Sequence, residues 1–377
     1  MKLSAMLLIS ILIISVSLPL IYIYYRTRDA NVTDEFYFGV SFGQNTAAEA
    51  KLLIDKVKGY TNMFLINSWN ITTNETALTE VSDYAVKANL KFMVFFDYIS
   101  RIIYHWHQTW LDTAKEKYGD KFLGVYLQDE LGGKQIDTKE AFAYASDYSD
   151  AANRFVNSIA SFNSTIDAKN KNIPIFTSDY ALYWFDYLAG YDAVFSELGW
   201  NQSTTQQISL CRGAANMQRK AWGAMIAWTY DKPPYIESGP KILQEMLTAY
   251  SAGAKYVIVF NYPKYPETNQ YGILTEEHFT AMKQFWDHVN ASSRNISEKV
   301  DEKVAFVLPK DYGWGMRNVG DTIWGLWPAD NIAPKIWENM NKLIQKYGLE
   351  LDIVYGDARF DISKKYSKVY WWNTTIN

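Results

Sequence analysis

The clearest pattern in the sequence is a series of eight short apolar runs, each bounded by polar residues or glycine. Short runs rich in β-branched and aromatic residues are typical of buried strands. The segments between them have the apolar spacing of helices, as in 45–60 and 240–256. The eight runs are FYFGVSF (36–42), TNMFLIN (61–67), LKFMVFF (90–96), FLGVYLQ (122–128), IPIFTS (173–178), YDAVFS (191–196), WGAMIAW (222–228) and KYVIVFN (255–261).

This alternation predicts an α/β fold with a (β/α)8 barrel over residues 34–299. The alternative is an open, doubly wound sheet, which usually has fewer strands. Such a sheet also carries a glycine-rich phosphate-binding fingerprint, which this sequence lacks. We therefore prefer the barrel.

The strand and helix pattern restarts after residue 300. Residues 303–309, 349–356 and 368–373 are predicted strands, and 331–348 has the spacing of a helix. This predicts a small C-terminal α/β domain over 300–377. It is too small for a second enzyme core, so we expect it to pack against the barrel.

The N-terminal segment predicts contact with a membrane. Residues 3–25 carry no charge, which is long enough for a helix to span a bilayer. We interpret residues 1–28 as an uncleaved membrane anchor. The alternative is a cleavable signal peptide, with Ser15 and Ser17 as small residues near a cut, and a secreted protein.

Glycosylation sequons indicate which side of the membrane the soluble part faces. Such sequons suggest exposure to a glycosylating compartment. The single cysteine, Cys211, cannot form an internal disulfide. We therefore expect a single-pass membrane protein whose soluble part faces outside. Eight Asn-x-Ser/Thr sequons occur, at Asn31, Asn70, Asn74, Asn163, Asn201, Asn290, Asn295 and Asn373.

Composition narrows the class of partner. The net charge is −4 with no dense Lys/Arg block, which argues against nucleic acid. Aromatic residues make up 16% of the chain, including 14 Trp and 28 Tyr. Such rings can be packed in the core, or they can line a sugar-binding cleft, where they cover C–H faces while their polar tips form hydrogen bonds.

Polar and aromatic residues gather where the predicted strands end. In a (β/α)8 barrel the catalytic residues lie at the carboxyl ends of the strands. Acidic residues there can also cap the following helices. The predicted carbohydrate-binding residues are Asn67, Trp69, Asp97, Tyr98, Gln128, Asp179, Trp200, Tyr230, Asn261 and Tyr262.

The fourth run ends in GVYLQDELGG, with two adjacent carboxylates. Strand alternation predicts one face turned to the helices and one turned into the barrel, so Glu130 is aimed at the cavity while Asp129 starts on the outer face. Local twisting at the strand end could bring Asp129 in as well. The like charge of Asp129 is expected to raise the pKa of a neighbouring acid, which suits Glu130 to general acid catalysis. The predicted outer face is Leu123, Val125 and Leu127; the predicted inner face is Gly124, Tyr126, Gln128 and Glu130.

The predicted barrel resembles the (β/α)8 glycoside hydrolases. The resemblance lies in Glu130 at the end of the fourth strand, in the carboxylates at the ends of later strands, and in the many aromatic residues. In their large retaining clan the resemblance implies that this Glu is the acid/base, although there it usually follows Asn rather than Asp129. That clan has its nucleophile Glu at the end of strand 7, where this chain has Asp231. The Asp-Glu pair is also similar to barrel hydrolases that use a substrate acetamido group as nucleophile.

Two residues are candidates for the second carboxylate of a glycoside hydrolase. Glu197 closes the sixth predicted strand beside Gly199 and Trp200, and Asp231 closes the seventh. We rank Glu197 slightly first. The predicted catalytic residues are therefore Glu130, Glu197, Asp231 and Asp129.

No cofactor or metal is predicted. His105 and His107 lie in a segment with helical character, and the chain has only four His. The sequence thus predicts a membrane-anchored glycoside hydrolase acting on an oligosaccharide or surface glycan. The alternative is a carbohydrate-binding or cell-envelope structural barrel without catalysis.

Overall fold

The structure, a computed structural model of the chain, describes residues 35–96, 105–200, 202–262, 269–291 and 304–376. Tyr37–Asn377 form one compact unit. The predicted anchor at 1–28 and the predicted domain boundary at 299–300 lie outside the described residues. In the described ranges no helix is both long and apolar enough to span a bilayer.

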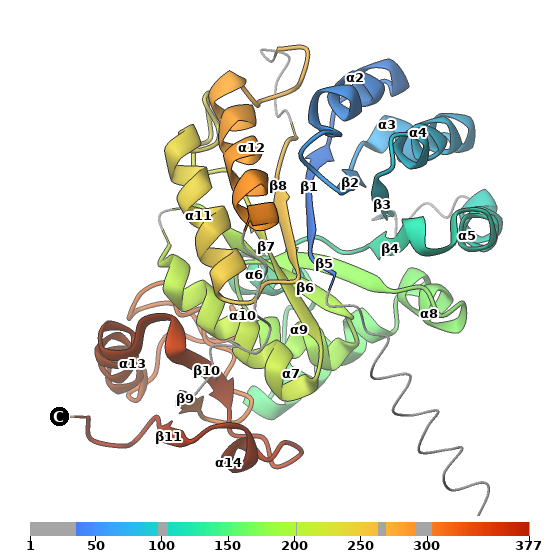
Figure 1. Ribbon diagram of the computed structural model, residues 1–377. Helices are drawn as coiled ribbons and strands as arrows, with labels where there is room; N and C mark the ends of the chain where they lie inside the picture. Colours follow the sequence, from blue (N-terminus) through green and yellow to red (C-terminus); the bar gives the residue numbers. More distant parts are fainter. Residues whose placement is uncertain (1–34, 97–104, 201, 263–268, 292–303, 377) are drawn as a thin grey trace, which may run out of the picture. The chain divides into compact units, whose positions relative to one another are not determined.

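Eight parallel strands close into a barrel, each paired with its neighbour in sequence and the last paired with the first (Figure 1). The predicted (β/α)8 barrel is confirmed, and each of the eight apolar runs overlaps one strand. The strands are β1 (Tyr37–Phe42), β2 (Met63–Ile66), β3 (Lys91–Phe95), β4 (Phe122–Tyr126), β5 (Ile175–Asp179), β6 (Ala193–Leu198), β7 (Ala221–Ile226) and β8 (Tyr256–Val259).

Helices connect successive strands, and five of the eleven helices given below begin with a side chain that accepts a free backbone N–H. The first has a capping box, in which Thr46 and Glu49 each accept a hydrogen bond from the other's backbone N–H. The helices are α2 (Ala47–Val57), α3 (Trp69–Thr72), α4 (Glu75–Lys87), α5 (His105–Tyr118), α6 (Leu131–Thr138), α7 (Tyr148–Ala160), α8 (Asn163–Asn170), α9 (Tyr183–Ala189), α10 (Thr204–Gln218), α11 (Gly239–Ser251) and α12 (Glu276–Ala291).

Large apolar side chains fill the barrel interior, including Met93, Tyr126, Phe195 and Met225. Tyr126 therefore faces inward, as predicted. Leu123 was predicted to face the helices, but it packs against this inner cluster. The reason is an irregularity in the β3–β4 pairing, where Phe92 pairs with Phe122 but Met93 with Gly124, whose φ is 138°.

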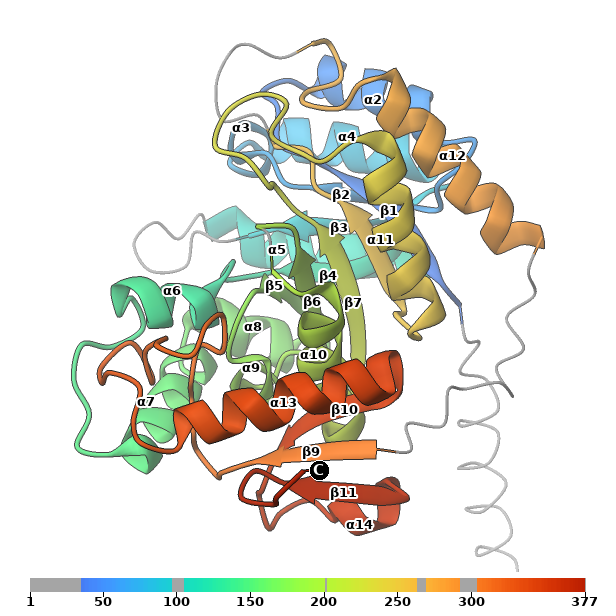
Figure 2. The same cartoon turned by 90° about the vertical axis from the view of Figure 1, so that its left-hand side faces the viewer.

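The C-terminal residues form a three-stranded parallel sheet with the order β10-β9-β11. Helix α13 contacts β9 and β10, while β10 also contacts α10 of the barrel (Figure 2). The strands and the long helix predicted after residue 300 are present, and a short helix, α14, joins the last two strands. The elements are β9 (Val304–Leu308), α13 (Ala333–Tyr347), β10 (Leu351–Tyr355), α14 (Ile362–Lys365) and β11 (Lys368–Trp371).

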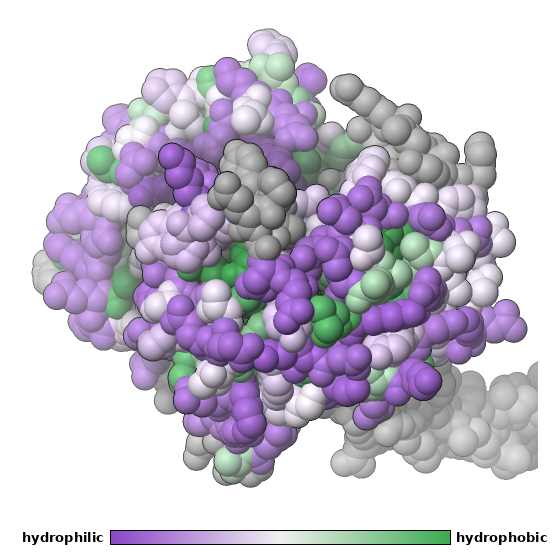
Figure 3. Space-filling view, turned by 90° about the horizontal axis from the view of Figure 1, so that it is seen from above, coloured by the Kyte–Doolittle hydropathy of each residue, from purple (hydrophilic) through white to green (hydrophobic). Residues whose placement is uncertain are grey.

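Most apolar side chains are in the interior. The face seen in Figure 3 is largely hydrophilic, with hydrophobic residues in separate patches. Two exposed tryptophans are exceptions that bear on function, because both follow strand ends. They are Trp69 and Trp200, which are 47% and 40% exposed.

Candidate active site

The turn after β4 reverses the strand alternation. Gln128 and Glu130 both have positive φ values, 51° and 58°. Left-handed conformations cost about 1–3 kcal/mol at residues other than glycine and gather at functional sites. Because of this turn Gln128 points away from the barrel interior, contrary to the prediction. Its side-chain amide donates 3.0 Å to Thr165 Oγ1 of α8, and it accepts a hydrogen bond from Tyr191.

The same turn brings both acidic residues of the QDE sequence into one pocket. Asp129 Oδ1 accepts hydrogen bonds from the hydroxyl of Tyr126, which points into the barrel, and from Ser178 Oγ at 3.1 Å. Glu130 is also in the pocket, as predicted, and its carboxyl lies 3.5 Å from Lys134 Nζ. Asp129 is thus an inner residue rather than an outer one.

Glu197 of β6 completes a cluster of three carboxyl groups. It is 4% exposed, and Ser178 Oγ lies 2.5 Å from its Oε1. Its carboxyl group is also close enough to that of Glu130 for a hydrogen bond when one of the two is protonated. In the barrel Glu197 pairs with Met225 of β7, so the end of β7 contributes an apolar side chain to this pocket.

The pocket around the three carboxyl groups is small, with a volume of about 40 Å³. That is enough for one or two water molecules. Its remaining walls are aromatic or apolar, so the carboxyl groups lie in surroundings of low polarity. These walls are Trp200, Met225, Ala227, Trp228 and Phe260.

Burial and mutual repulsion raise the pKa values of Glu197 and Glu130. The pKa of Glu197 is raised well above its usual value, first by burial and then by the charges of Glu130 and Asp129. Burial and the charge of Asp129 also raise the pKa of Glu130, while Lys134 opposes that rise. Two carboxyl groups in hydrogen-bond contact cannot both be ionised without large repulsion. A proton held between Glu130 and Glu197 relieves this repulsion, and the larger rise in pKa at Glu197 favours that proton on Glu197.

Asp179 does not line the pocket but binds backbone N–H groups of the neighbouring turns. Its carboxyl is fully buried and accepts four backbone N–H groups, including those of Gly132 at 2.5 Å and Gly133 at 2.7 Å. A Cβ at Gly132 would lie 2.5 Å from the Ala181 carbonyl oxygen. The paired glycines after Glu130 thus allow the first turn of α6 to approach this carboxyl closely.

The other predicted site residues are scattered around the barrel. Asn261 is fully buried and ties the Tyr271–Ile273 loop through two hydrogen bonds, so it holds a loop rather than facing the pocket. Asp231 is exposed, five residues beyond the end of β7, and does not line the pocket. Asn67 is buried at the end of β2, and Tyr262 stacks on the pocket residue Phe260.

Trp69 lies at the start of α3, and Tyr230 is exposed with its hydroxyl 3.2 Å from Glu237. Neither lines the carboxylate pocket, whereas Trp200 does. Asp97 and Tyr98 lie outside the described residues.

Three residues of the site were not predicted from the sequence, although simple signals pointed to them. Ser178 is two residues after the inward Phe176 on β5, and strand alternation places both on one face. Tyr126 was predicted to face inward but was given no role. Lys134 follows Glu130 by four residues, the spacing of a helical ion pair.

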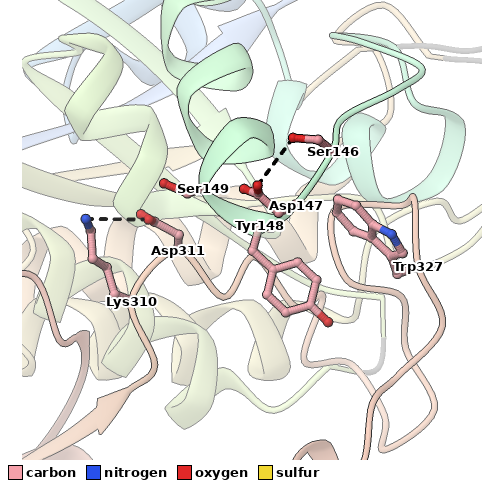
Figure 4. Close-up of a pocket in the computed structure, with 7 residues that line it drawn as sticks. All are labelled: Ser146, Asp147, Tyr148, Ser149, Lys310, Asp311 and Trp327. Atoms are coloured by element: carbon pink, nitrogen blue, oxygen red, sulfur yellow. Dashed lines mark hydrogen bonds and ion pairs between the residues drawn. The ribbon is translucent and has the colours of Figure 1, made fainter.

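A larger cavity of about 570 Å³ lies elsewhere, beside the start of α7 (Figure 4). It shares no residue with the carboxylate pocket. The close-up shows Tyr148 and Trp327 on one side and Lys310 near Asp311 on the other. No described group of three or more His, Cys, Asp or Glu residues has a metal-binding arrangement.

Comparison with known proteins gives a fold relationship. No family model and no curated protein sequence matches the chain. Among solved structures, the chain is similar to the GH5_18 protein of Streptomyces cattleya in complex with GlcNAc, with 13% identity, a TM-score of 0.52, and coverage of 90% of this chain and 98% of that one. It is also similar to the β-galactosidase of the Antarctic haloarchaeon Halorubrum lacusprofundi, with 11% identity, a TM-score of 0.59, and coverage of 89% and 68%. The chain is thus a (β/α)8 barrel with glycoside hydrolases among its structural neighbours.

Proposed function

We propose that the protein is a glycoside hydrolase whose catalytic pair is Glu130 and Glu197. The observation that carries this proposal is the contact between the carboxyl groups of Glu130 and Glu197 in one pocket, at the carboxyl ends of β4 and β6. Glycoside cleavage needs one protonated and one ionised carboxyl group on either side of the scissile bond. Repulsion between the two groups favours one proton for the pair, so the pair can supply both forms.

We assign the general acid to Glu130, which is the more exposed of the two and closes β4. Its proton passes to the leaving oxygen as the glycosidic C–O bond breaks. Lys134, 3.5 Å away, then stabilises the carboxylate that remains on Glu130. Glu197, which the pKa shifts favour as the holder of the proton in the free protein, passes that proton to Glu130 and then provides the ionised carboxylate that bonds to the anomeric carbon.

This arrangement favours retention of configuration. Retaining enzymes hold the two carboxyl groups about 5–5.5 Å apart, and inverting enzymes about 6.5–9.5 Å apart. Groups already in hydrogen-bond contact are closer to the first class. In the second step Glu130 takes a proton from water, which attacks the anomeric carbon and releases Glu197.

The first test is leaving-group dependence. Glu130→Gln keeps the shape of the acid but removes its transferable proton, so turnover of natural glycosides should fall by about 10²–10⁴. The loss should be much smaller for aryl glycosides with good leaving groups. Glu197→Gln should slow good and poor leaving groups alike, as a nucleophile variant does.

Asp231→Asn is the matched control, because Asp231 was the rival second carboxylate and lies outside the pocket. It should leave turnover near that of the wild type. A large loss in Asp231→Asn with normal Glu197→Gln would replace Glu197 in this proposal. Leaving-group dependence in Glu197→Gln instead of Glu130→Gln would exchange the two roles.

The small pocket supports a second candidate, a carbohydrate-binding protein without catalysis. A cavity of about 40 Å³ cannot enclose a sugar ring. In that case sugars would bind over Trp200, and the wild type would show no turnover. Glu130→Gln would then bind sugars as tightly as the wild type does.

We also propose, from the sequence, that the protein is anchored in a membrane with its barrel outside. The support is the uncharged run 3–25 together with the sequons. The five described acceptors, Asn70, Asn74, Asn163, Asn290 and Asn373, are all exposed.

Deletion of residues 1–34 should move the protein from the membrane fraction to a soluble, folded form. Mass spectrometry of protein from its native host should find glycans on several of these asparagines; a complete absence would contradict the outward orientation.

A further inference from the structure

A second carboxyl pair lies behind the proposed catalytic pair and is unused by the mechanism above. Asp179 ends β5, and Asp186 lies on the next helix, α9. Both side chains are fully buried, and they contact each other. The two oxygens of Asp186 receive no hydrogen bond from any N–H or O–H group of the described residues.

The two partners differ in their surroundings. Asp179 accepts four backbone N–H groups, which suit a carboxylate. Asp186 has no such donors, and a buried carboxylate without donors or a cation is very costly. Asp186 is therefore the member that needs a proton, and as a neutral acid it donates that proton to Asp179.

The neighbouring titratable groups do not change this conclusion. Burial raises the pKa values of Tyr183 and Tyr187 on α9 and of Cys211 on α10, so all three are neutral. Glu197 of β6 lies near enough to Asp179 for their charges to repel. Burial also raises the pKa of Asp179 to about 7, although its N–H donors oppose that rise.

Asp179 is linked to both residues of the catalytic pair through hydrogen bonds and through residues adjacent in the sequence. Two of the N–H groups on Asp179 come from Gly132 and Gly133, which directly follow Glu130 and Leu131. The residue before Asp179 is Ser178, whose hydroxyl contacts both Asp129 and Glu197. A shift of Asp179 would therefore move both sides of the site.

We propose that Asp186 is a protonated carboxylic acid that donates to Asp179, and that the two together position Glu130 by fixing the first turn of α6. The positioning role rests on the proposed function. The shared proton does not, because it follows from burial and contacts alone.

The proton is tested by infrared difference spectroscopy of the full chain near neutral pH. Asp186→Asn should remove one carbonyl-stretch band of a protonated carboxyl group. Asp352→Asn is the matched control, since Asp352 is equally buried but is paired with Arg212, so no such band should disappear. Failure of Asp186→Asn to remove a band would overturn the proposal, whether or not the protein hydrolyses glycosides.

Stability against pH is an independent readout. A carboxyl group whose pKa is raised by folding stabilises the native state at low pH, and this stabilisation is lost as pH rises above its unfolded pKa, near 4. The denaturation midpoint of the wild type should therefore fall more between pH 5 and pH 8 than that of Asp186→Asn. An equal fall in both proteins would contradict a protonated Asp186.

The positioning role is tested by comparing two substitutions. In Asp186→Asn the amide N–H can still donate to Asp179, so kcat should stay within about threefold of the wild type. Asp186→Leu has no donor, and kcat should fall at least tenfold with a smaller change in KM. Equal loss in both variants, or in neither, would show that the hydrogen bond does not position Glu130.

Discussion

Ser178 has one hydroxyl proton but lies between two carboxyl groups, Asp129 and Glu197. Tyr126 can donate its own proton to Asp129, which leaves that of Ser178 for Glu197. The contact between Glu197 and Glu130 then requires a further proton that neither hydroxyl supplies. At the scale of single residues, three carboxyl groups therefore share three protons: the hydroxyl protons of Tyr126 and Ser178, and one proton between Glu130 and Glu197.

The charge of Asp129 is predicted to set the alkaline limit of activity. It raises the pKa of Glu130, after burial, and so keeps the acid protonated to higher pH. Asp129→Asn should lower that pKa and move the alkaline limb of the kcat/KM profile to lower pH. Asp287→Asn, an exposed carboxylate on α12, should leave the limb in place. An upward shift in Asp129→Asn would show that Asp129 does not act through its charge.

The sequence proposed Glu130 and Glu197 as site residues from their positions at the ends of the fourth and sixth strands, and both side chains line one pocket in the structure. It misplaced Gln128, and it left open whether Asp129 turns inward, because alternation assumes extended backbone and the positive φ values of Gln128 and Glu130 break it. A sequence signals such a left-handed turn chiefly through glycine or asparagine, which adopt positive φ values readily, and neither residue occurs at Gln128 or Glu130. The turn is held by contacts from distant segments, such as Tyr191 on Gln128.

At the scale of elements, α6 is the part of the barrel on which the site most depends. It begins directly after Glu130, and its first turn is held by Asp179. Its later residues contact the loop before α13, where Gln135 donates to the Trp324 carbonyl and Asp137 pairs with Arg317 at 2.8 Å. Strands and helices were predictable from short-range periodicity, but these long-range supports were not.

Gly132→Ala tests the dependence of the site on α6. The added Cβ would lie 2.5 Å from the Ala181 carbonyl oxygen, a backbone atom that cannot turn away. We expect a loss of about 1–3 kcal/mol in the free energy of unfolding, together with a loss of turnover as Glu130 is displaced. Gly59→Ala is the control, since a Cβ there meets nothing within 4 Å. Unchanged stability and turnover in Gly132→Ala would mean that the turn can move without cost.

At the scale of the whole molecule, one buried ion pair joins the barrel to the C-terminal sheet. Arg212 of α10 donates 2.7 Å to Asp352 of β10, and both side chains are almost completely buried. Arg212 also donates to the carbonyl oxygens of Leu349 and Leu351. The sequence predicted a separate small domain that packs on the barrel. The ion pair explains how that contact is specified, but the pairing of two charges 140 residues apart has no signal in a single sequence.

Arg212→Met should therefore destabilise the entire unit Tyr37–Asn377 rather than release the C-terminal sheet alone. It leaves Asp352 buried with only the neutral donors Asn216 and Tyr366, and removal of one partner of a buried pair costs about 3–5 kcal/mol. The double variant Arg212→Met with Asp352→Leu removes both charges and should recover most of that loss. Denaturant unfolding, followed by tryptophan fluorescence and by circular dichroism, should give one coincident transition in all three proteins. Two transitions in Arg212→Met, the first with barrel activity intact, would instead mean that the C-terminal sheet unfolds as an independent domain.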